Sequence, residues 1–277
     1  MAIALLAIPL FVTGCGNGAS STDTLQSPAV VEQASTVGLQ PSYIFAVCGD
    51  NRTMGIESGV LPKIIESAKA RGAVFMVDTG DVTESGEPEE LLLYRNLTEA
   101  SGLRFYTVPG NHDVGSGGVS DAYEQIIGSY YFSFDYAGDN FIVVDNADDR
   151  TGIDAAQMQW LKENLDSGNN KPHQFIFAHI PVTDPSLPSD HVSGEKGGEG
   201  LRSGQAMVEM AGSHANMDAF FFGHIHAYLA YSLYGIDAYV TGGAGAPLYF
   251  PENAGGYYHY LLVNVYPDRV NVEVVRI

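Results

Sequence analysis

Apolar runs alternate along the chain with segments in which apolar residues recur at helical spacing. The runs at 43–48, 73–77, 105–109, 174–178 and 218–222 predict buried β-strands. Helical spacing predicts helices at 61–70, from Pro88 onward, after Asp154 and at 203–214. Continuous apolar strands separated by helices are typical of a sheet that is covered on both faces. The pattern therefore predicts an α/β domain.

Three other stretches complete this domain, which we place at 41–277. Residues 130–136 and 140–144 predict a hairpin, and the part after residue 227 predicts short alternating strands with Gly- and Tyr-rich turns. The segment 181–201 is long, rich in Gly and Pro and without periodicity. Such loops often carry function, so we expect an active-site loop there.

The first forty residues differ from the rest. Residues 2–12 are almost wholly apolar, as in a signal-peptide core, and are too few to span a bilayer as a helix. The sequence Val12-Thr13-Gly14-Cys15 resembles a bacterial lipoprotein signal, in which the cysteine becomes the lipid-bearing N-terminus. The absence of basic residues before the apolar core indicates an atypical signal or a start further upstream. We expect a signal segment at 1–15, a disordered tether at 16–40, and a lipid-anchored, extracytoplasmic protein of the bacterial envelope.

The amino-acid composition limits the kinds of molecule that the protein is expected to bind. The chain has 277 residues, 45% of them hydrophobic, which suffices for one large core, and its formal net charge is −20. Such acidity argues against binding to a nucleic-acid backbone and otherwise describes a well-solvated surface. We expect a monomer whose partner is a small molecule. If Cys15 carries lipid, only Cys48 remains, so the chain has no disulfide framework.

Five of the predicted strands end in residues of the kind that bind metals. These residues are Asp50, Asp81, Asn111 with His112, His179, and His224 with His226. Oxygen and imidazole donors gathered at one sheet edge suit cations such as Mn, Fe or Zn. Two ions about 3.5–4 Å apart, bridged by a carboxylate, form the clamp used in phosphoester hydrolysis. Each motif alone is weak evidence, but five strand ends in one order are not a coincidence.

The motif series resembles that of the calcineurin-like metallophosphoesterases. It consists of Gly49-Asp50, Gly80-Asp81, Gly110-Asn111-His112-Asp113, His179 and Gly223-His224-Ile225-His226. The resemblance extends from residue 43 to about residue 228. It implies a four-layer α/β sandwich with two central mixed β-sheets flanked by helices.

The same resemblance implies roles for individual residues. Asp81 would bridge two metal ions, with Asn111, His179 and His224 completing one site and Asp50 and His226 holding the other. His112 would protonate the leaving alkoxide or stabilise the phosphoryl oxygens. A metal-bound water, its pKa lowered towards roughly 7, would be the nucleophile.

Two positions are informative because they differ within the family. Many members have Asp-x-His in the first motif, whereas this chain has Arg52, which cannot bind a metal because it has only donors. Arg52 would therefore either grip a substrate phosphate or form a surface ion pair, and the Asp50/His226 site would be weaker. Glu84 stands where an acid orients the catalytic histidine in protein-phosphatase relatives, so it is expected to orient His112. The absence of a tyrosine at that position argues against the purple-acid-phosphatase subgroup.

The sequence thus predicts a metal-dependent phosphoesterase, with monoester and diester substrates both open. A protein phosphatase is disfavoured, because the arginine-bearing signature expected after Gly110–Asp113 is missing. The alternative is a lipoprotein that keeps the fold, has little or no activity, and binds phosphorylated ligands. Arg52 is the one feature that favours this alternative.

Overall fold

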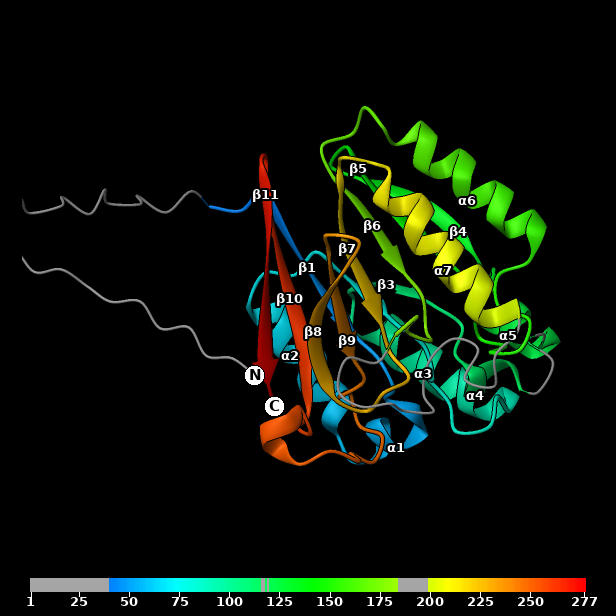
Figure 1. Cartoon of the computed structure of the whole chain (residues 1–277). Coiled ribbons are helices and arrows are strands. Elements are labelled where there is room, and N and C mark those ends of the chain that lie inside the picture. The colour runs from blue at the N-terminus through cyan, green and yellow to red at the C-terminus, as the bar shows by residue number, and fades with distance from the viewer. Residues whose placement is uncertain (1–39, 116–117, 119, 184–198) are drawn as a thin grey trace, which may run out of the picture. The chain divides into compact units, whose positions relative to one another are not determined.

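The computed structural model describes residues 40–115, 118, 120–183 and 199–277. Figure 1 shows the arrangement of their helices and strands. The strands are β1 (Tyr43–Cys48), β2 (Phe75–Asp78), β3 (Arg104–Thr107), β4 (Phe132–Tyr136), β5 (Asp139–Val143), β6 (Gln174–Phe177), β7 (Met217–Phe222), β8 (Tyr228–Leu233), β9 (Ile236–Thr241), β10 (His259–Tyr266) and β11 (Arg269–Arg276). The helices are α1 (Arg52–Glu57), α2 (Val60–Ala70), α3 (Pro88–Ala100), α4 (Asn111–Val114), α5 (Asp121–Ile126), α6 (Ala155–Ser167), α7 (Glu199–Gly212) and the 3₁₀ helix η1 (Glu252–Ala254).

The described strands form two mixed sheets. The five-stranded sheet has the order β11-β10-β1-β2-β3, in which β1, β2 and β3 are parallel and β10 is antiparallel to both of its neighbours. The six-stranded sheet has the order β4-β5-β6-β7-β9-β8, with β5, β6, β7 and β9 parallel between antiparallel edge strands. Parallel neighbours end at the same edge of a sheet, so the loops after β1, β2 and β3 lie together, as do those after β6 and β7.

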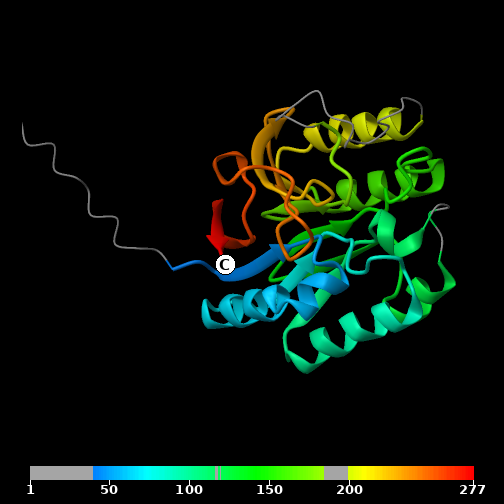
Figure 2. The same cartoon turned by 90° about the horizontal axis from the view of Figure 1, so that it is seen from below.

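Helices cover the outer face of each sheet. Figure 2 shows α2 and α3, in cyan and teal, on one side and α6 and α7, in green and yellow, on the other. The inner faces of the sheets pack on each other through aromatic rings. Phe45 of β1 lies 5.2 Å from Phe75 in its own sheet and 5.3 Å from Phe141 in the other, measured between ring centroids. Edge-to-face and offset ring pairs of this kind are favourable, and they fix the distance between the sheets. The predicted four-layer sandwich is confirmed.

The hydrophobic pattern locates the long elements well and the short helices poorly. The strand at 43–48 is β1, and the Asp154 side chain accepts a hydrogen bond from the Gln157 backbone N–H at the start of α6. Helices α1, α4 and α5 have only six, four and six residues. A helix this short has no apolar stripe to recognise, so its sequence resembles a loop.

Several predicted segments fall outside the described residues. The signal segment at 1–15 and all of the tether except residue 40 are among them, as is the central part, 184–198, of the expected active-site loop. None of the helices that the structure describes is long and apolar enough to cross a membrane.

Candidate metal centre

The loops that follow β1, β2 and β7 share an unusual backbone conformation. Asp50, Asp81 and His224 have positive φ angles of 59°, 54° and 67°. Residues other than glycine adopt this conformation at a cost of roughly 1–3 kcal/mol each, and such strain concentrates at functional sites. Hydrogen bonds join these loops. The Asp50 N–H donates to the Gly80 carbonyl at 2.9 Å, and the His224 N–H donates to the Asp50 carboxylate at 2.9 Å. The predicted ligands are therefore held by backbone as well as by side-chain contacts.

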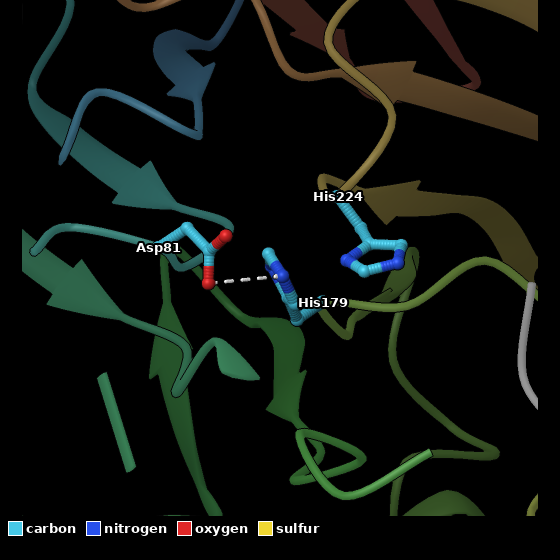
Figure 3. Close-up of side chains that lie close together, drawn as sticks. All are labelled: Asp81, His179 and His224. Carbon is cyan, nitrogen blue, oxygen red and sulfur yellow. Dashed lines mark ion pairs between the residues drawn. The ribbon is translucent and has the colours of Figure 1, made fainter. Parts of the chain in front are cut away.

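The first group of candidate ligands is Asp81, His179 and His224, whose donor atoms all lie within 4.8 Å of one another. Figure 3 shows their side chains lying close together, with His179 between Asp81 and His224. Nε2 of His179 lies 3.2 Å from Oδ1 of Asp81. The amide oxygen of Asn111 joins the group, at 3.0 Å from His179 Nε2 and 2.9 Å from His224 Nδ1. The structure thus brings together the four residues expected to form one site.

The second group is Asp50, Asp81 and His226, again with all donor atoms within 4.8 Å. Nε2 of His226 lies 3.5 Å from Oδ1 of Asp50. All three residues are buried. Asp81 belongs to both groups, which is what a bridging carboxylate requires.

The hydrogen bonds of the histidines test whether a cation fits. Nδ1 of His179 faces the Thr79 carbonyl at 2.8 Å, and Nδ1 of His226 faces the Pro247 carbonyl at 2.7 Å. A carbonyl accepts only, so each Nδ1 must carry the proton and each Nε2 lone pair is left for a ligand. Those Nε2 atoms face oxygen atoms that are themselves acceptors, an arrangement that requires a proton or a cation between them. A backbone carbonyl behind the ring is also the usual partner of a metal-bound histidine.

The pKa shifts of Asp81 and His179 in the first group of ligands also fit a bound cation. Burial by itself would lower the pKa of His179, but the adjacent Asp81 carboxylate raises it to about 9. Burial would raise the pKa of Asp81, yet His179, helped by His112, holds it below its usual range. Without metal, the His179 proton thus occupies the position that a cation would take. The residues present fit a pair of divalent ions.

His112, Arg52 and Glu84 form a cluster beside the shared carboxylate. His112 donates its backbone N–H to Asp81 Oδ1 at 2.9 Å, and its Nδ1 donates to the backbone carbonyl of Glu84 at 2.7 Å. Arg52 donates from Nη2 to His112 Nε2 at 2.8 Å and from Nη1 to both Glu84 carboxylate oxygens at 3.2 Å. Glu84 therefore contacts His112 through its main chain, while its carboxylate holds Arg52.

Arg52 also lies beside the second group of ligands. Its Nη2 is 3.6 Å from Asp81 Oδ2, and its side chain is 11% exposed. The sequence offers a surface ion pair as one role for Arg52. The pair with Glu84 does exist, but the guanidinium itself is largely enclosed at the metal centre.

Three buried residues that are not among the predicted ligands support the loops. Asp78 accepts hydrogen bonds from the Asn51 amide at 2.8 Å and the Gly80 N–H at 3.2 Å. Asp113 accepts from the Gly110 N–H at 2.9 Å, and Asn146 accepts from the His179 N–H at 2.9 Å. Two of them could have been identified from the sequence, because Asp113 belongs to a recognised motif and Asp78 is an acid at the end of a buried strand.

Comparison with known proteins agrees with the geometry. Residues 44–228 match the family model described as calcineurin-like phosphoesterase. A protein of Arcobacter nitrofigilis, described as a probable glycerophosphodiester phosphodiesterase GpdQ, is 22% identical over 166 residues. That match covers 55% of this chain and 56% of the relative, so the chain spans little more than half the length of this relative.

Solved structures share the fold. A dimetal phosphatase from Danio rerio aligns over 85% of this chain and 96% of its own, with a TM-score of 0.64 and 16% identity. The purple acid phosphatase PPD1 of yellow lupin aligns over 84% of this chain and 51% of its own, with a TM-score of 0.64 and 17% identity. GAP50 of Plasmodium aligns over 84% of each chain, with a TM-score of 0.60 and 13% identity. Because the family model covers most of the domain and includes every candidate ligand, the chain belongs to the calcineurin-like phosphoesterase family.

Proposed function

We propose that this protein hydrolyses phosphoesters at a dinuclear metal centre formed by Asp50, Asp81, Asn111, His179, His224 and His226. The observation that carries the proposal is the sharing of Asp81 between two groups of ligand atoms, each within 4.8 Å. Two bound divalent cations would polarise the phosphoryl oxygens and lower the pKa of a water molecule at the centre. Mn, Fe and Zn all suit this mixture of carboxylate, amide and imidazole ligands.

The remaining residues of the centre orient the substrate. His112 is 31% exposed, and its Nε2 lies 4.0 Å from Asp81 Oδ2, so it can reach a phosphoryl group bound at the metals. Its role is to protonate the leaving alkoxide or to stabilise the phosphoryl oxygens. Arg52 already donates from both Nη atoms, and an incoming phosphate would take over the Nη2 donor from His112. Glu84 fixes both, through its carboxylate and its main-chain carbonyl.

We place this activity on the extracytoplasmic face of a bacterial membrane, with the chain anchored through lipid on Cys15. The support is the sequence Val12-Thr13-Gly14-Cys15 after an apolar stretch, followed by a segment poor in apolar residues. Mass spectrometry of the native N-terminus tests the proposal. An unprocessed Met1 or an unmodified Cys15 would contradict it.

The second candidate is a protein that binds phosphorylated ligands and turns them over slowly or not at all. It is favoured by Arg52, which stands 3.6 Å from the shared carboxylate where many relatives have a ligand. A positive charge there opposes binding of a second cation. The fold is compatible with a non-enzymatic role, since GAP50 is described as an anchor in the inner membrane complex of Plasmodium.

The decisive experiment is a screen of monoesters and diesters against the metal-free chain reloaded with Mn, Fe or Zn. We expect hydrolysis with at least one metal and none after chelation. Asp81→Asn, prepared in the same way, controls for a contaminating hydrolase. Binding of inorganic phosphate without turnover of any ester would instead favour the second candidate.

A further inference from the structure

We infer that Tyr249 is a stacking platform for a flat ring in the alcohol part of the substrate. The inference rests on the proposed function, because it concerns what lies beside a phosphoester held at the metals. It narrows the substrate class to phosphoesters whose alcohol carries an aromatic or heteroaromatic ring. Nothing in the ligand set itself gives this information.

The first observation is the position of the Tyr249 ring. Its centroid lies 4.7 Å from that of His226, and the two ring planes differ by 17°. The Tyr249 ring is therefore nearly parallel to the ring of a candidate metal ligand and lies within stacking distance of it. The His226 side chain is only 2% exposed, whereas Tyr249 is 64% exposed. One face of the tyrosine thus covers the ligand, and much of the rest of the ring is open to solvent beside the centre.

The second observation is that the loop carrying Tyr249 is fixed at several points. The Pro247 carbonyl accepts from His226 Nδ1 at 2.7 Å, and the Ala246 N–H donates to the Asp50 carbonyl at 2.8 Å. On the other side of Tyr249, Phe250 packs against the core cluster of the six-stranded sheet. A ring held in this way loses little freedom when a ligand stacks on it, and preorganisation of this kind strengthens binding.

The third observation is chemical. A buried imidazole can be shielded by any apolar side chain, but an exposed aromatic ring in parallel orientation also offers a second π-face. Stacked rings lie roughly 4.5–7 Å apart between centroids. A ligand ring on the open face of Tyr249 would then be two stacking distances, roughly 9–14 Å, from the His226 ring, so a flexible linker of several atoms must join it to the phosphorus.

A matched pair of ligands tests the inference. Calorimetry would measure binding of 6-phenylhexylphosphonate and 6-cyclohexylhexylphosphonate, whose linkers are long enough to reach Tyr249, to the metal-loaded chain. The two have the same linker and similar apolar bulk, and only the first has a flat π-face. We expect the phenyl compound to bind roughly two- to tenfold more tightly. The preference should persist in Tyr249→Phe and disappear in Tyr249→Ala.

Tyr234 provides the control. It is 67% exposed, in the turn between β8 and β9 at the end of β8 remote from the metal ligands, so Tyr234→Ala should keep the preference. Equal affinities for the two phosphonates, no binding of either, or a preference that survives in Tyr249→Ala would overturn the inference. So would a Tyr249→Ala variant that loses metal and weakens both ligands equally, because Tyr249 would then only shield His226.

The outcome is separable from that of the proposed function. A ring preference in binding without hydrolysis of the corresponding esters would contradict the proposed hydrolysis and leave the role of Tyr249 intact. Hydrolysis of both 6-phenylhexyl and 6-cyclohexylhexyl phosphate esters, with equal affinity for the two phosphonates, would contradict the role of Tyr249 and leave the proposed hydrolysis intact.

Discussion

The two halves of the metal centre share Asp81 but differ in how completely the protein supplies ligands. One half has Asp81, Asn111, His179 and His224, with the Asn111 oxygen within 3.0 Å of both imidazoles. The other has Asp50, Asp81 and His226, and the Arg52 guanidinium lies 3.6 Å from the shared carboxylate. We expect the first half to hold its ion firmly and the second to depend on water or substrate to complete its ligands.

The difference shows what a single substitution in a motif can do. A histidine in the place of Arg52 would add a neutral ligand, whereas arginine adds a fixed positive charge and N–H donors. Arginine at this position is therefore expected to lower the affinity for a cation and to raise the affinity for an anion. Each of the following predictions would break or sharpen this contrast.

Asp81→Asn should have the largest effect, since it removes the charge that both halves share. We expect metal content to fall in both sites and hydrolysis to drop to the background level. Elemental analysis of the purified variant, together with turnover, measures both. Asp148→Asn is a suitable control, because Asp148 lies outside both ligand groups. Full activity with two ions in Asp81→Asn would rule out a bridging role.

His112→Ala should lower kcat by roughly 10²–10⁴-fold if the imidazole acts as a general acid, with metal content nearly unchanged. The loss should shrink for substrates with good leaving groups, which need less protonation. A loss that does not depend on the leaving group would instead indicate stabilisation of the phosphoryl oxygens. Glu84→Gln should have a much smaller effect on kcat, because the main-chain carbonyl that holds His112 is unchanged and only the ion pair with Arg52 is weakened. A fall in the metal content of this variant would make Glu84 a ligand.

The pH dependence of metal binding should reveal the proton that His179 carries in the metal-free chain. His179, with its pKa raised to about 9, holds a proton at neutral pH that a metal must displace. Affinity for the ion at His179 should therefore rise about tenfold per pH unit up to about pH 9. In the metal-free chain the same proton stabilises the fold below about pH 6.5, and this stabilisation is lost as the pH rises through 9. Calorimetric titrations at several pH values measure the first effect, and chemical denaturation measures the second. Affinity independent of pH would exclude a protonated His179.

Arg52→Ala should have a smaller effect, raising KM or weakening inhibition by phosphate by roughly tenfold or more, since hydrogen bonds to charged groups contribute about 1.5–3 kcal/mol. The number of bound ions should stay the same. Arg52→His should tighten the second ion at the expense of phosphate affinity. Unchanged KM and phosphate inhibition in Arg52→Ala would reduce Arg52 to a partner of Glu84.

Much of this arrangement can be predicted from the sequence, for a physical reason. Buried parallel strands such as β1 and β2 are continuous apolar runs, and their ends must lie at a common edge, so Asp50 and Asp81 could be placed together without coordinates. The family resemblance added the assignment of ligands to two ions. The short helix α1 could not be foreseen, because six residues carry no periodicity.

Other contacts depend on the path of the main chain and not on residue type. Which part of Glu84 reaches His112 is decided by the loop after β2, where the carbonyl, not the carboxylate, faces the imidazole. The stacking of Tyr249 on His226 likewise joins residues 23 positions apart, with β8 and β9 between them, and depends on the irregular segment that follows β9. Neither contact has a pattern that a sequence can display.

Titration of the metal-free chain with Mn²⁺, followed by calorimetry and elemental analysis, tests the unequal two-metal centre most directly. We predict two ions per chain with clearly different affinities. His179→Ala should remove the tight binding phase, and His226→Ala the weak one. One ion or none in the wild-type chain, or two equivalent ions that both variants affect alike, would contradict the account.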